Sequence, residues 1–357
     1  MNKSRFYTDM FLDQMRREGD TAADEVVKEV FSTGSATQMH QLMAHLDKNN
    51  QKLPAELPII ARDFFQNQAV LPTWADPDKM RRGADFFKKY QEAILTLLGF
   101  LSLPYCYAAA DGAQVLYLSE QIRSNTLRRL TETAQFVLQV MDTEAFAPEG
   151  AGFVSTLKVR LMHATVRYHI LKSKHWDTAW GLPINQEDMG GTNGAFSWMS
   201  VRGLRKMGYF PEPIAVEDFY HLWSVIGTLM GVREELLPDT TQEIYTLDRK
   251  IVQRHFRKSE AGVKLTGALL KVFYENKEQN FPKGFPESYM RFLLGDRIAD
   301  MLGIPPSNWT RSLLSPLRYL NNLNGFLGIK PSDKFQDDIT RKISEEKADF
   351  QIPLKLP

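Results

Sequence analysis

Apolar residues recur at helical spacing along most of this chain. Within residues 80–101, for example, the aromatic and aliphatic positions fall three or four residues apart, which places them on one face of a helix. No stretch of strand length alternates regularly between apolar and polar residues. The pattern predicts an all-α protein, with helices over residues 20–31, 38–46, 59–65, 80–101, 155–173, 196–206, 216–231, 249–276, 287–303 and 312–327, and one or two more within 113–140.

Segments rich in proline and glycine separate the predicted helices. Residues 71–77 and 190–194 (Gly-Gly-Thr-Asn-Gly) are expected to form loops, because these residue types interrupt helices. The chain has no internal repeat and no low-complexity linker. We therefore predict a single domain over residues 1–357, with a core at about 70–327, an N-terminal helical extension over 1–69 and a peripheral tail over 328–357.

Composition and charge narrow the classes of function. The chain has 357 residues, of which 43% are hydrophobic, and its 44 basic residues nearly balance its 43 acidic ones. A net charge of +1 gives no electrostatic reason to expect a nucleic-acid partner. Cys106 is the only cysteine, which excludes an intramolecular disulfide and a cysteine-rich metal site. Because the N-terminus carries charges and no apolar signal segment, we expect a cytoplasmic protein.

One uncharged stretch, residues 93–110, raises the question of a membrane span. Pro104 and several small polar residues interrupt it, so a buried core helix that ends in a turn is the favoured interpretation. We expect no stable membrane insertion. The sequence also lacks G-x-G-x-x-G, P-loop, H-E-x-x-H and paired Glu-x-x-His motifs, which removes support for nucleotide, zinc-protease and di-iron sites.

A single histidine lies between two arginines on one helical stripe. At about 100° per residue, Arg160, His163 and Arg167 point in the same direction. Burying such a stripe costs free energy unless its polar groups find partners. A haem would supply all of them, with its iron taking the imidazole nitrogen and its propionates meeting the arginines. The alternative is a core histidine bonded to a backbone carbonyl, with arginines that extend to water.

A second stripe carries Arg129, Glu132 and Thr133. These residues share one helical face, and together they would make a polar pocket wall: a cation for an anion, a carboxylate for proton transfer and a hydroxyl for hydrogen bonding. The alternative is a surface ion pair between Arg129 and Glu132. Further on, Asn185 and Asp188 suit helix capping, and Thr192 among glycines could approach a flat cofactor closely.

These segments together resemble a known family. The motifs are Arg-x-x-x-Thr at 129–133, Val-Arg-Leu-Met-His-Ala-x-Val-Arg at 159–167 and Pro-x-Asn-Gln-Glu-Asp-Met-x-x-Thr-x-x-x-Phe-Ser at 183–197. Shorter matches are Leu-Pro-x-Trp-Ala-Asp at 71–76, Gly-x-x-Phe-Phe at 83–87 and Leu-Pro-x-x-Tyr at 103–107. In this order they resemble the latex clearing protein (rubber oxygenase) and mycophenolate-pathway oxygenase family, over about residues 20–320.

The resemblance implies a globin-like helical core around one b-type haem, with additional N- and C-terminal helices. His163 would be the proximal iron ligand, with Arg160 and Arg167 beside it on the same helix. Thr192 matches the threonine that follows the family's Asn-Gln-Glu-Asp turn.

On the distal side the resemblance implies roles for Arg129 and Thr133. Rubber oxygenases carry a lysine at the position of Glu132, and a carboxylate replaces that amine poorly as a distal ligand, so a closed six-coordinate haem is not expected here. The family's catalytic acid lies upstream of the arginine, where Asp111 is the better candidate and Glu120 the other.

The resulting hypothesis is a haem b-dependent oxygenase, namely a dioxygenase that uses O2 to cleave a carbon–carbon double bond of a small apolar isoprenoid or unsaturated lipid. The alternative is a haem-binding sensor or carrier without turnover, which needs His163 but no distal catalytic group. A third interpretation is a helical interaction protein without a cofactor. The sequence does not specify the oligomeric state.

Overall fold

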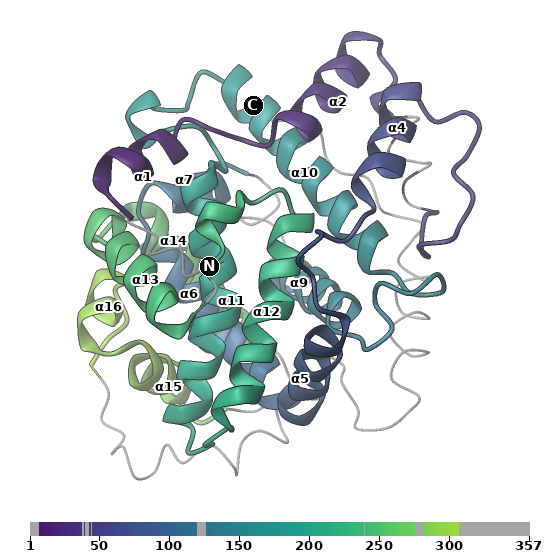
Figure 1. Ribbon diagram of the computed structural model, residues 1–357. Coiled ribbons are helices and arrows are strands. Elements are labelled where there is room, and N and C mark those ends of the chain that lie inside the picture. The colour runs from purple at the N-terminus through teal and green to yellow at the C-terminus, as the bar shows by residue number, and fades with distance from the viewer. Residues whose placement is uncertain are drawn as a thin grey trace.

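The regular elements of the described chain are helices (Figure 1). The computed structural model describes residues 7–37, 39, 43, 45–119, 126–238, 240–275 and 281–306. Within these ranges the only β contact is an isolated bridge between Ala109 and Phe256, so the predicted all-α fold is confirmed. The α-helices are α1 Asp9–Met15, α2 Thr21–Ser32, α4 Ile59–Gln68, α5 Pro77–Leu97, α6 Leu103–Tyr107, α7 Gly112–Leu118, α9 Thr126–Val140, α10 Gly152–Lys172, α11 Gln186–Lys206, α12 Pro213–Leu229, α13 Thr241–His255, α14 Glu260–Glu275, α15 Phe285–Leu294 and α16 Asp296–Met301. A π-helix (η1 Leu98–Ser102) and two 3-10 turns (η2 Thr178–Trp180, η3 Glu234–Leu236) complete the set.

The expected loop over residues 190–194 is wrong, because α11 begins at Gln186 and runs through it. Asn185 caps this helix and accepts a hydrogen bond from the Asp188 amide at 2.9 Å, as predicted. Gly190 serves close packing here, because a Cβ on it would lie 3.0 Å from the Leu236 side chain. Glycine therefore marks a tight contact between α11 and η3 rather than a turn.

Two long helices predicted near the C-terminus are each divided. The stretch 249–276 forms α13 and α14, because Phe256 adopts an extended conformation and bridges to Ala109. The stretch 287–303 forms α15 and α16, separated at Gly295, whose φ of +89° does not fit a helix. The helix predicted over 312–327, the tail over 328–357 and part of 38–46 lie outside the described residues.

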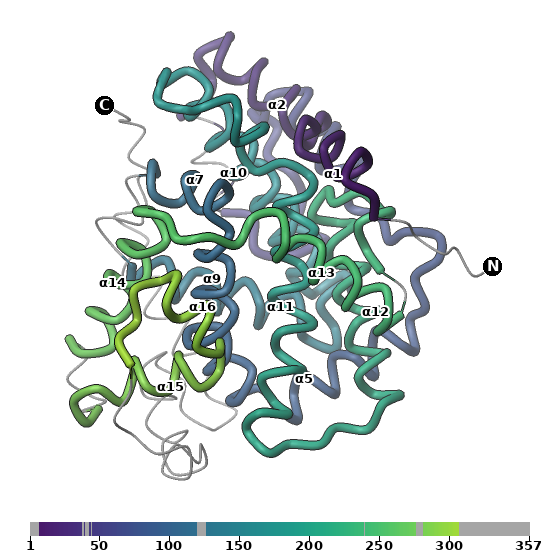
Figure 2. The backbone as a smooth tube through the Cα atoms, turned by 90° about the vertical axis from the view of Figure 1, so that its left-hand side faces the viewer, coloured from purple at the N-terminus to yellow at the C-terminus, as the bar shows by residue number. Residues whose placement is uncertain are grey.

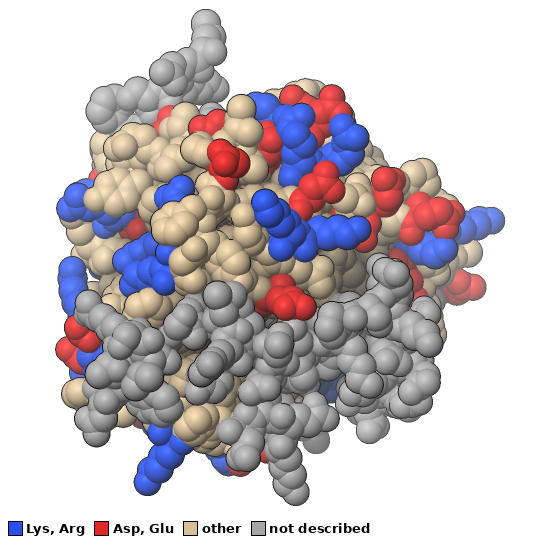
Figure 3. All heavy atoms as spheres, turned by 90° about the horizontal axis from the view of Figure 1, so that it is seen from below, with Lys and Arg blue, Asp and Glu red and all other residues tan. Residues whose placement is uncertain are grey.

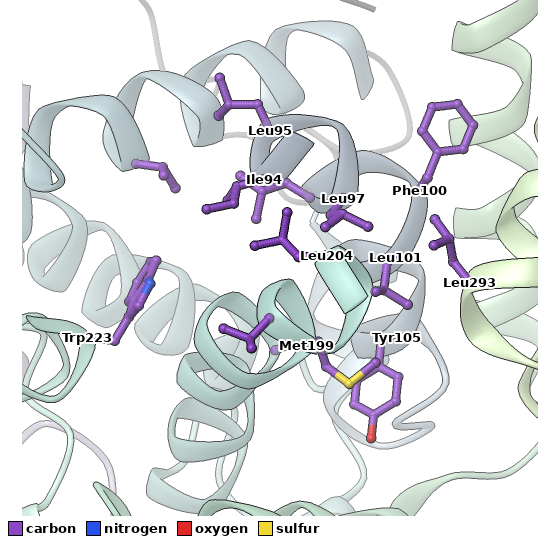
Figure 4. Close-up of a cluster of buried hydrophobic side chains, with 14 of the residues drawn as sticks. Ile94, Leu95, Leu97, Phe100, Leu101, Tyr105, Met199, Leu204, Trp223 and Leu293 are labelled. Atoms are coloured by element: carbon purple, nitrogen blue, oxygen red, sulfur yellow. The ribbon is translucent and has the colours of Figure 1, made fainter. Parts of the chain in front are cut away.

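The larger hydrophobic core lies where α5, η1, α11 and α12 pack together. In Figure 4, Leu97 and Leu101 meet Leu204 of α11, and all three side chains are buried. The close approach of α5 and α12 requires Gly83, where a Cβ would lie 2.6 Å from the Asp218 carbonyl oxygen. The uncharged stretch 93–110 belongs to this core. None of the described helices has the length and apolarity needed to cross a membrane.

A smaller hydrophobic core joins the N-terminal extension to α10. Leu157 and Leu161 of α10 are fully buried against a cluster that includes Val26 of α2 and Phe65 of α4. Figure 2 shows α2 at the top of the molecule next to α10, with α1 further to the right. The helix that carries His163 therefore lies between the N-terminal extension and the rest of the chain.

Charge is mixed on the one face that Figure 3 shows. Where side chains are drawn in colour, basic and acidic groups are interspersed among neutral ones. This distribution agrees with a net charge of +1.

Candidate functional site

The two sides of α10 differ in burial. The side that faces the N-terminal extension contains Leu157, Leu161 and Ala164, and each of these is at most 1% exposed. Several residues on the other side keep part of their surface accessible although the helix lies in the interior: Val159, Met162, His163 and Val166. Their spacing of three and four residues places them on one face of the helix. Partly accessible apolar residues on an interior helix indicate that its neighbours leave a space at this face.

His163 is the polar group on this face. Its Nδ1 is buried and has no hydrogen-bond partner, while the residue as a whole keeps some accessible surface. The accessible edge of the ring is therefore the one that carries Nε2. Burial, followed by the positive charges of Arg129 and Arg167, lowers the pKa of His163 to about 3. The imidazole is thus neutral, which is the state that binds a metal ion.

A face of α9 lies opposite His163. Arg129, Glu132, Thr133 and Phe136 are all partly exposed and follow the same helical spacing. The Nη1 of Arg129 lies 3.5 Å from the Met162 Sδ on α10, which joins the two faces. The predicted polar stripe on α9 therefore does reach the neighbourhood of His163.

Cys106 on α6 and Thr192 on α11 lie next to each other. Thr192 is exposed although it lies beside the Cys106 thiol, whose pKa burial raises to about 12. Tyr107, the next residue on α6, lies within electrostatic reach of Arg129. We call the partly accessible side chains on these faces of α6, α9, α10 and α11 the chamber, and define it by Cys106, Arg129, Thr133, Phe136, Val159, Met162, His163, Val166 and Thr192.

The residues of the chamber fit a haem. Among the described residues no group of three or more His, Cys, Asp or Glu side chains could hold a bare metal ion. Haem iron needs only one axial imidazole from the protein, and the rest of the porphyrin needs apolar contacts. His163 offers an unbonded ring nitrogen, and Phe136, Val159 and Val166 supply the apolar surface around it.

Comparisons with known proteins show the family to which the chain belongs. The family model described as "ER-bound oxygenase mpaB/B'/Rubber oxygenase, catalytic domain" matches residues 96–321, which is more than half of the chain. The chain belongs to this oxygenase family. The rubber oxygenase of Streptomyces sp. (strain K30) is 26% identical over 288 residues, which cover 80% of this chain and 70% of that protein. The structure of latex clearing protein in the closed state matches with a TM-score of 0.77 and 24% identity, over 96% of this chain and 92% of that chain.

Glu132, where the resemblance implies a lysine in rubber oxygenases, is held by the arginines next to it. Its carboxylate accepts from Arg128 Nε at 3.0 Å and lies 3.9 Å from Arg129 Nη1, and its side chain is 37% exposed. The ion pair between Arg129 and Glu132 is therefore present, but the shorter pair of Glu132 is with Arg128. Thr133 donates to the Arg129 carbonyl oxygen at 2.8 Å.

Arg160 and Arg167 are more deeply buried than the sequence indicated. Their exposed fractions are 5% and 2%, so the alternative in which they extend to water is wrong. Each pairs with a carboxylate of the N-terminal extension, Arg160 with Asp20 and Arg167 with Asp24. Asp20 is also the N-cap of α2, where its side chain accepts from the Ala23 amide. The predicted contact of the two arginines with haem propionates stays a prediction.

A buried group of charged side chains lies at the N-terminal end of α11, one helical turn from Thr192. Arg16 Nη1 lies 3.0 Å from Asp188 Oδ1. His255 Nε2 lies 3.0 Å from Glu187 Oε1. We define this ion cluster as Arg16, Asp111, Glu187, Asp188, Arg254 and His255.

Asp111, the predicted catalytic acid, belongs to the ion cluster. It pairs with Arg257 and lies 3.8 Å from the Nδ1 of His255. Burial raises its pKa, but His255 and Arg257 outweigh burial, and the pKa of Asp111 is lowered. A role in catalysis stays a prediction, and the second candidate, Glu120, lies outside the described residues.

Titration of His255 should make the stability of the protein depend on pH. Burial lowers the pKa of His255, but the Asp111 and Glu187 carboxylates outweigh it, so the net shift is upward. Because the pKa of His255 is higher in the folded chain than in the unfolded chain, its protonation stabilises the fold. This stabilisation is complete at pH values below the pKa in the unfolded chain, about 6.5, and is lost as the pH rises through the pKa in the folded chain. We expect the Tm difference between wild type and His255→Gln to be largest below about pH 6 and to shrink at higher pH. A difference that does not change across this range would contradict the assignment.

Proposed function

We propose that the chain is a haem b-dependent oxygenase that uses O2 to cleave a carbon–carbon double bond of an apolar isoprenoid or unsaturated lipid. The observation that carries the proposal is the neutral, unbonded imidazole of His163, which faces the chamber. Membership of the oxygenase family supports it. The Streptomyces relative is named a rubber oxygenase, which supports an apolar polyisoprene-like substrate.

The residues of the chamber would have different roles in binding the cofactor and the substrate. His163 would hold the iron, and bound haem would supply the chemistry that activates O2. Phe136, Val159 and Val166 would bind an apolar chain and exclude water from it. Thr192 would lie against the cofactor, as the resemblance implies.

Arg129 and Thr133 would supply the polar groups of the opposite wall. The Arg129 guanidinium contacts the Met162 sulfur at 3.5 Å and the Glu132 carboxylate at 3.9 Å. Both contacts are weak, because sulfur is a poor acceptor and the ion pair is long. The guanidinium can therefore donate to an oxygen atom that develops negative charge in the chamber.

A haem-binding sensor or carrier is the second candidate function. The observation that favours it is Glu132, which is paired with Arg128 and so differs from the lysine implied for rubber oxygenases. This function uses the same chamber but predicts no turnover.

Oxygen uptake by the haem-loaded protein separates the two functions. The full chain is reconstituted with haem b, reduced, and supplied with polyisoprene, short isoprenoids and unsaturated lipids, while an oxygen electrode and mass spectrometry follow O2 and carbonyl products. We expect uptake that yields two carbonyl fragments from at least one alkene. We expect Thr133→Val, which keeps the shape of the side chain and removes its hydroxyl, to lower the rate by roughly 100-fold, the lower end of the range for loss of one polar active-site group. Tight haem binding without uptake for any alkene would favour the carrier, and no haem binding would refute both functions.

A further inference from the structure

The two arginines on either side of His163 are each tied to helix α2. Arg160 Nε donates to Asp20 Oδ2 at 2.7 Å, and its Nη2 donates to Asp20 Oδ1 at 2.8 Å. Arg167 Nη1 donates to the carboxylate of Asp24, one turn further along α2. His163 lies three residues after the first arginine and four before the second, so α10 is held on both sides of the histidine.

Every nitrogen of both guanidinium groups donates to the protein. The remaining Arg160 nitrogen, Nη1, donates to Gln68 Oε1 on α4 at 2.9 Å. Arg167 Nε and Nη2 donate to the carbonyl oxygens of Pro183 and Ile184 at 2.9 and 2.8 Å, just before α11. Each guanidinium keeps one or two of its five N–H groups unused, but exposed fractions of 5% for Arg160 and 2% for Arg167 leave a cofactor propionate little access to them.

Glycines cover both ion pairs closely. Gly231 has a φ of +80°, and a Cβ there would lie 2.5 Å from Asp20 Oδ2 and 2.9 Å from Arg160 Nε. A Cβ on Gly19 would lie 3.0 Å from both the Arg167 Nε and an Asp24 carboxylate oxygen. The backbone thus packs directly on the charged groups, which limits how far they can move.

We propose that Asp20–Arg160 and Asp24–Arg167 are clamps that position His163, so that the two arginines act through the histidine rather than by contact with the propionates. Buried ion pairs contribute little net stability, because desolvation offsets their attraction, and the best-attested reason for keeping one is that it fixes a single arrangement. The clamps fix the rotation of α10 that turns His163 toward the chamber and Leu161 toward the N-terminal core. The N-terminal extension is then part of the cofactor site. This inference rests on the proposed haem-dependent function.

The test compares haem b with its dimethyl ester, which has no charged propionates. Asp20→Asn in the full chain keeps the shape of the side chain and removes its charge. We expect this variant to bind both haems more weakly by the same factor, about 10- to 100-fold, which is typical of groups that orient a metal ligand. If the arginines bind the propionates instead, Asp20→Asn frees Arg160 and leaves the affinity for haem b unchanged or tighter, and that result would overturn the proposal.

Asp218→Asn is the matched control, because it breaks an ion pair of a buried carboxylate near the start of α12, whereas Arg160 lies at Leu229 at the other end of that helix. Asp218 is 4% exposed and accepts from Arg82 Nε at 2.6 Å and Nη2 at 3.2 Å, between α12 and α5. We expect it to lower stability without changing the affinity for either haem. An equal loss of affinity in Asp218→Asn would mean general destabilisation and would refute the clamps. If Asp20→Asn does not fold, Asp24→Asn takes its place. The Asp24 side chain is 33% exposed, so removing its charge lowers the stability of the protein less.

A second readout does not depend on haem. In apoprotein labelled with 15N-histidine, we expect the imidazole resonances of His163 to shift in Asp20→Asn and to stay in place in Asp218→Asn. Wild type that takes up no haem would refute the proposed function, whereas unchanged His163 resonances in Asp20→Asn would refute the clamps alone.

Discussion

His163→Ala is expected to abolish specific haem binding. His163 is the one chamber residue with an unbonded imidazole, and removing it takes away the only axial ligand that we assign. Mutation of a group that only orients a metal ligand lowers the metal affinity by about 10- to 100-fold. Loss of the ligand itself should therefore lower the haem affinity by more than about 100-fold. The measurement is haem titration, followed by absorption spectra of the ferric, ferrous and CO-bound forms beside wild type.

His169→Ala is the matched control for this result. His169 lies on the same helix but turns toward the N-terminal extension, where its ring packs edge-on against Phe31 with 4.9 Å between the ring centroids. We expect the control to keep the wild-type Soret band and to lose about 1 kcal/mol of stability. His163→Gly with added imidazole should recover the band, because the free base can occupy the space of the lost side chain. A wild-type spectrum in His163→Ala would show that the iron ligand lies elsewhere.

Arg16→Ala is expected to have the largest effect on stability. Arg16 is 7% exposed, and its Nη1 lies 3.0 Å from Asp188 and 3.4 Å from Glu187. Its Nη2 donates to the Trp180 carbonyl oxygen. Without the guanidinium, the buried Glu187 and the partly buried Asp188 lose a positive partner, and removing one member of a buried ion pair typically costs about 3–5 kcal/mol. Urea unfolding of the full chain measures this loss.

Arg17→Ala, at the next position, is the control for Arg16→Ala. Arg17 is exposed, so we expect its loss to change the free energy of unfolding by no more than about 0.5 kcal/mol. Arg16→Lys should recover only part of the stability, because an ammonium keeps the charge but not the planar fork that reaches several acceptors. Equal stabilities for Arg16→Ala and Arg17→Ala would show that Arg254 and His255 suffice to stabilise the acidic end of α11.

The sequence was sufficient to predict the fold class. A helix in a globular protein buries one face, so its apolar residues must recur every three or four positions. That local rule predicted the all-α fold and the face of α9 that carries Arg129 and Thr133. It also identified the stripe that contains His163, and the motifs around this residue were specific enough to indicate the oxygenase family. The same local rules were wrong for residues 190–194, because a glycine that packs against another helix cannot be distinguished in sequence from a glycine in a turn.

Tertiary structure alone decided which charged groups meet. Asp20 and Arg160 are 140 residues apart, and Arg16 and His255 are 239 apart, so no spacing rule connects them. From the sequence, Arg160 and Arg167 lacked partners and a cofactor was the natural candidate, whereas the fold provides Asp20 and Asp24. Periodicity determines which face of a helix is buried, but the partner on that face depends on how distant segments pack, and this is why the ion cluster and the clamps emerge only from the folded chain.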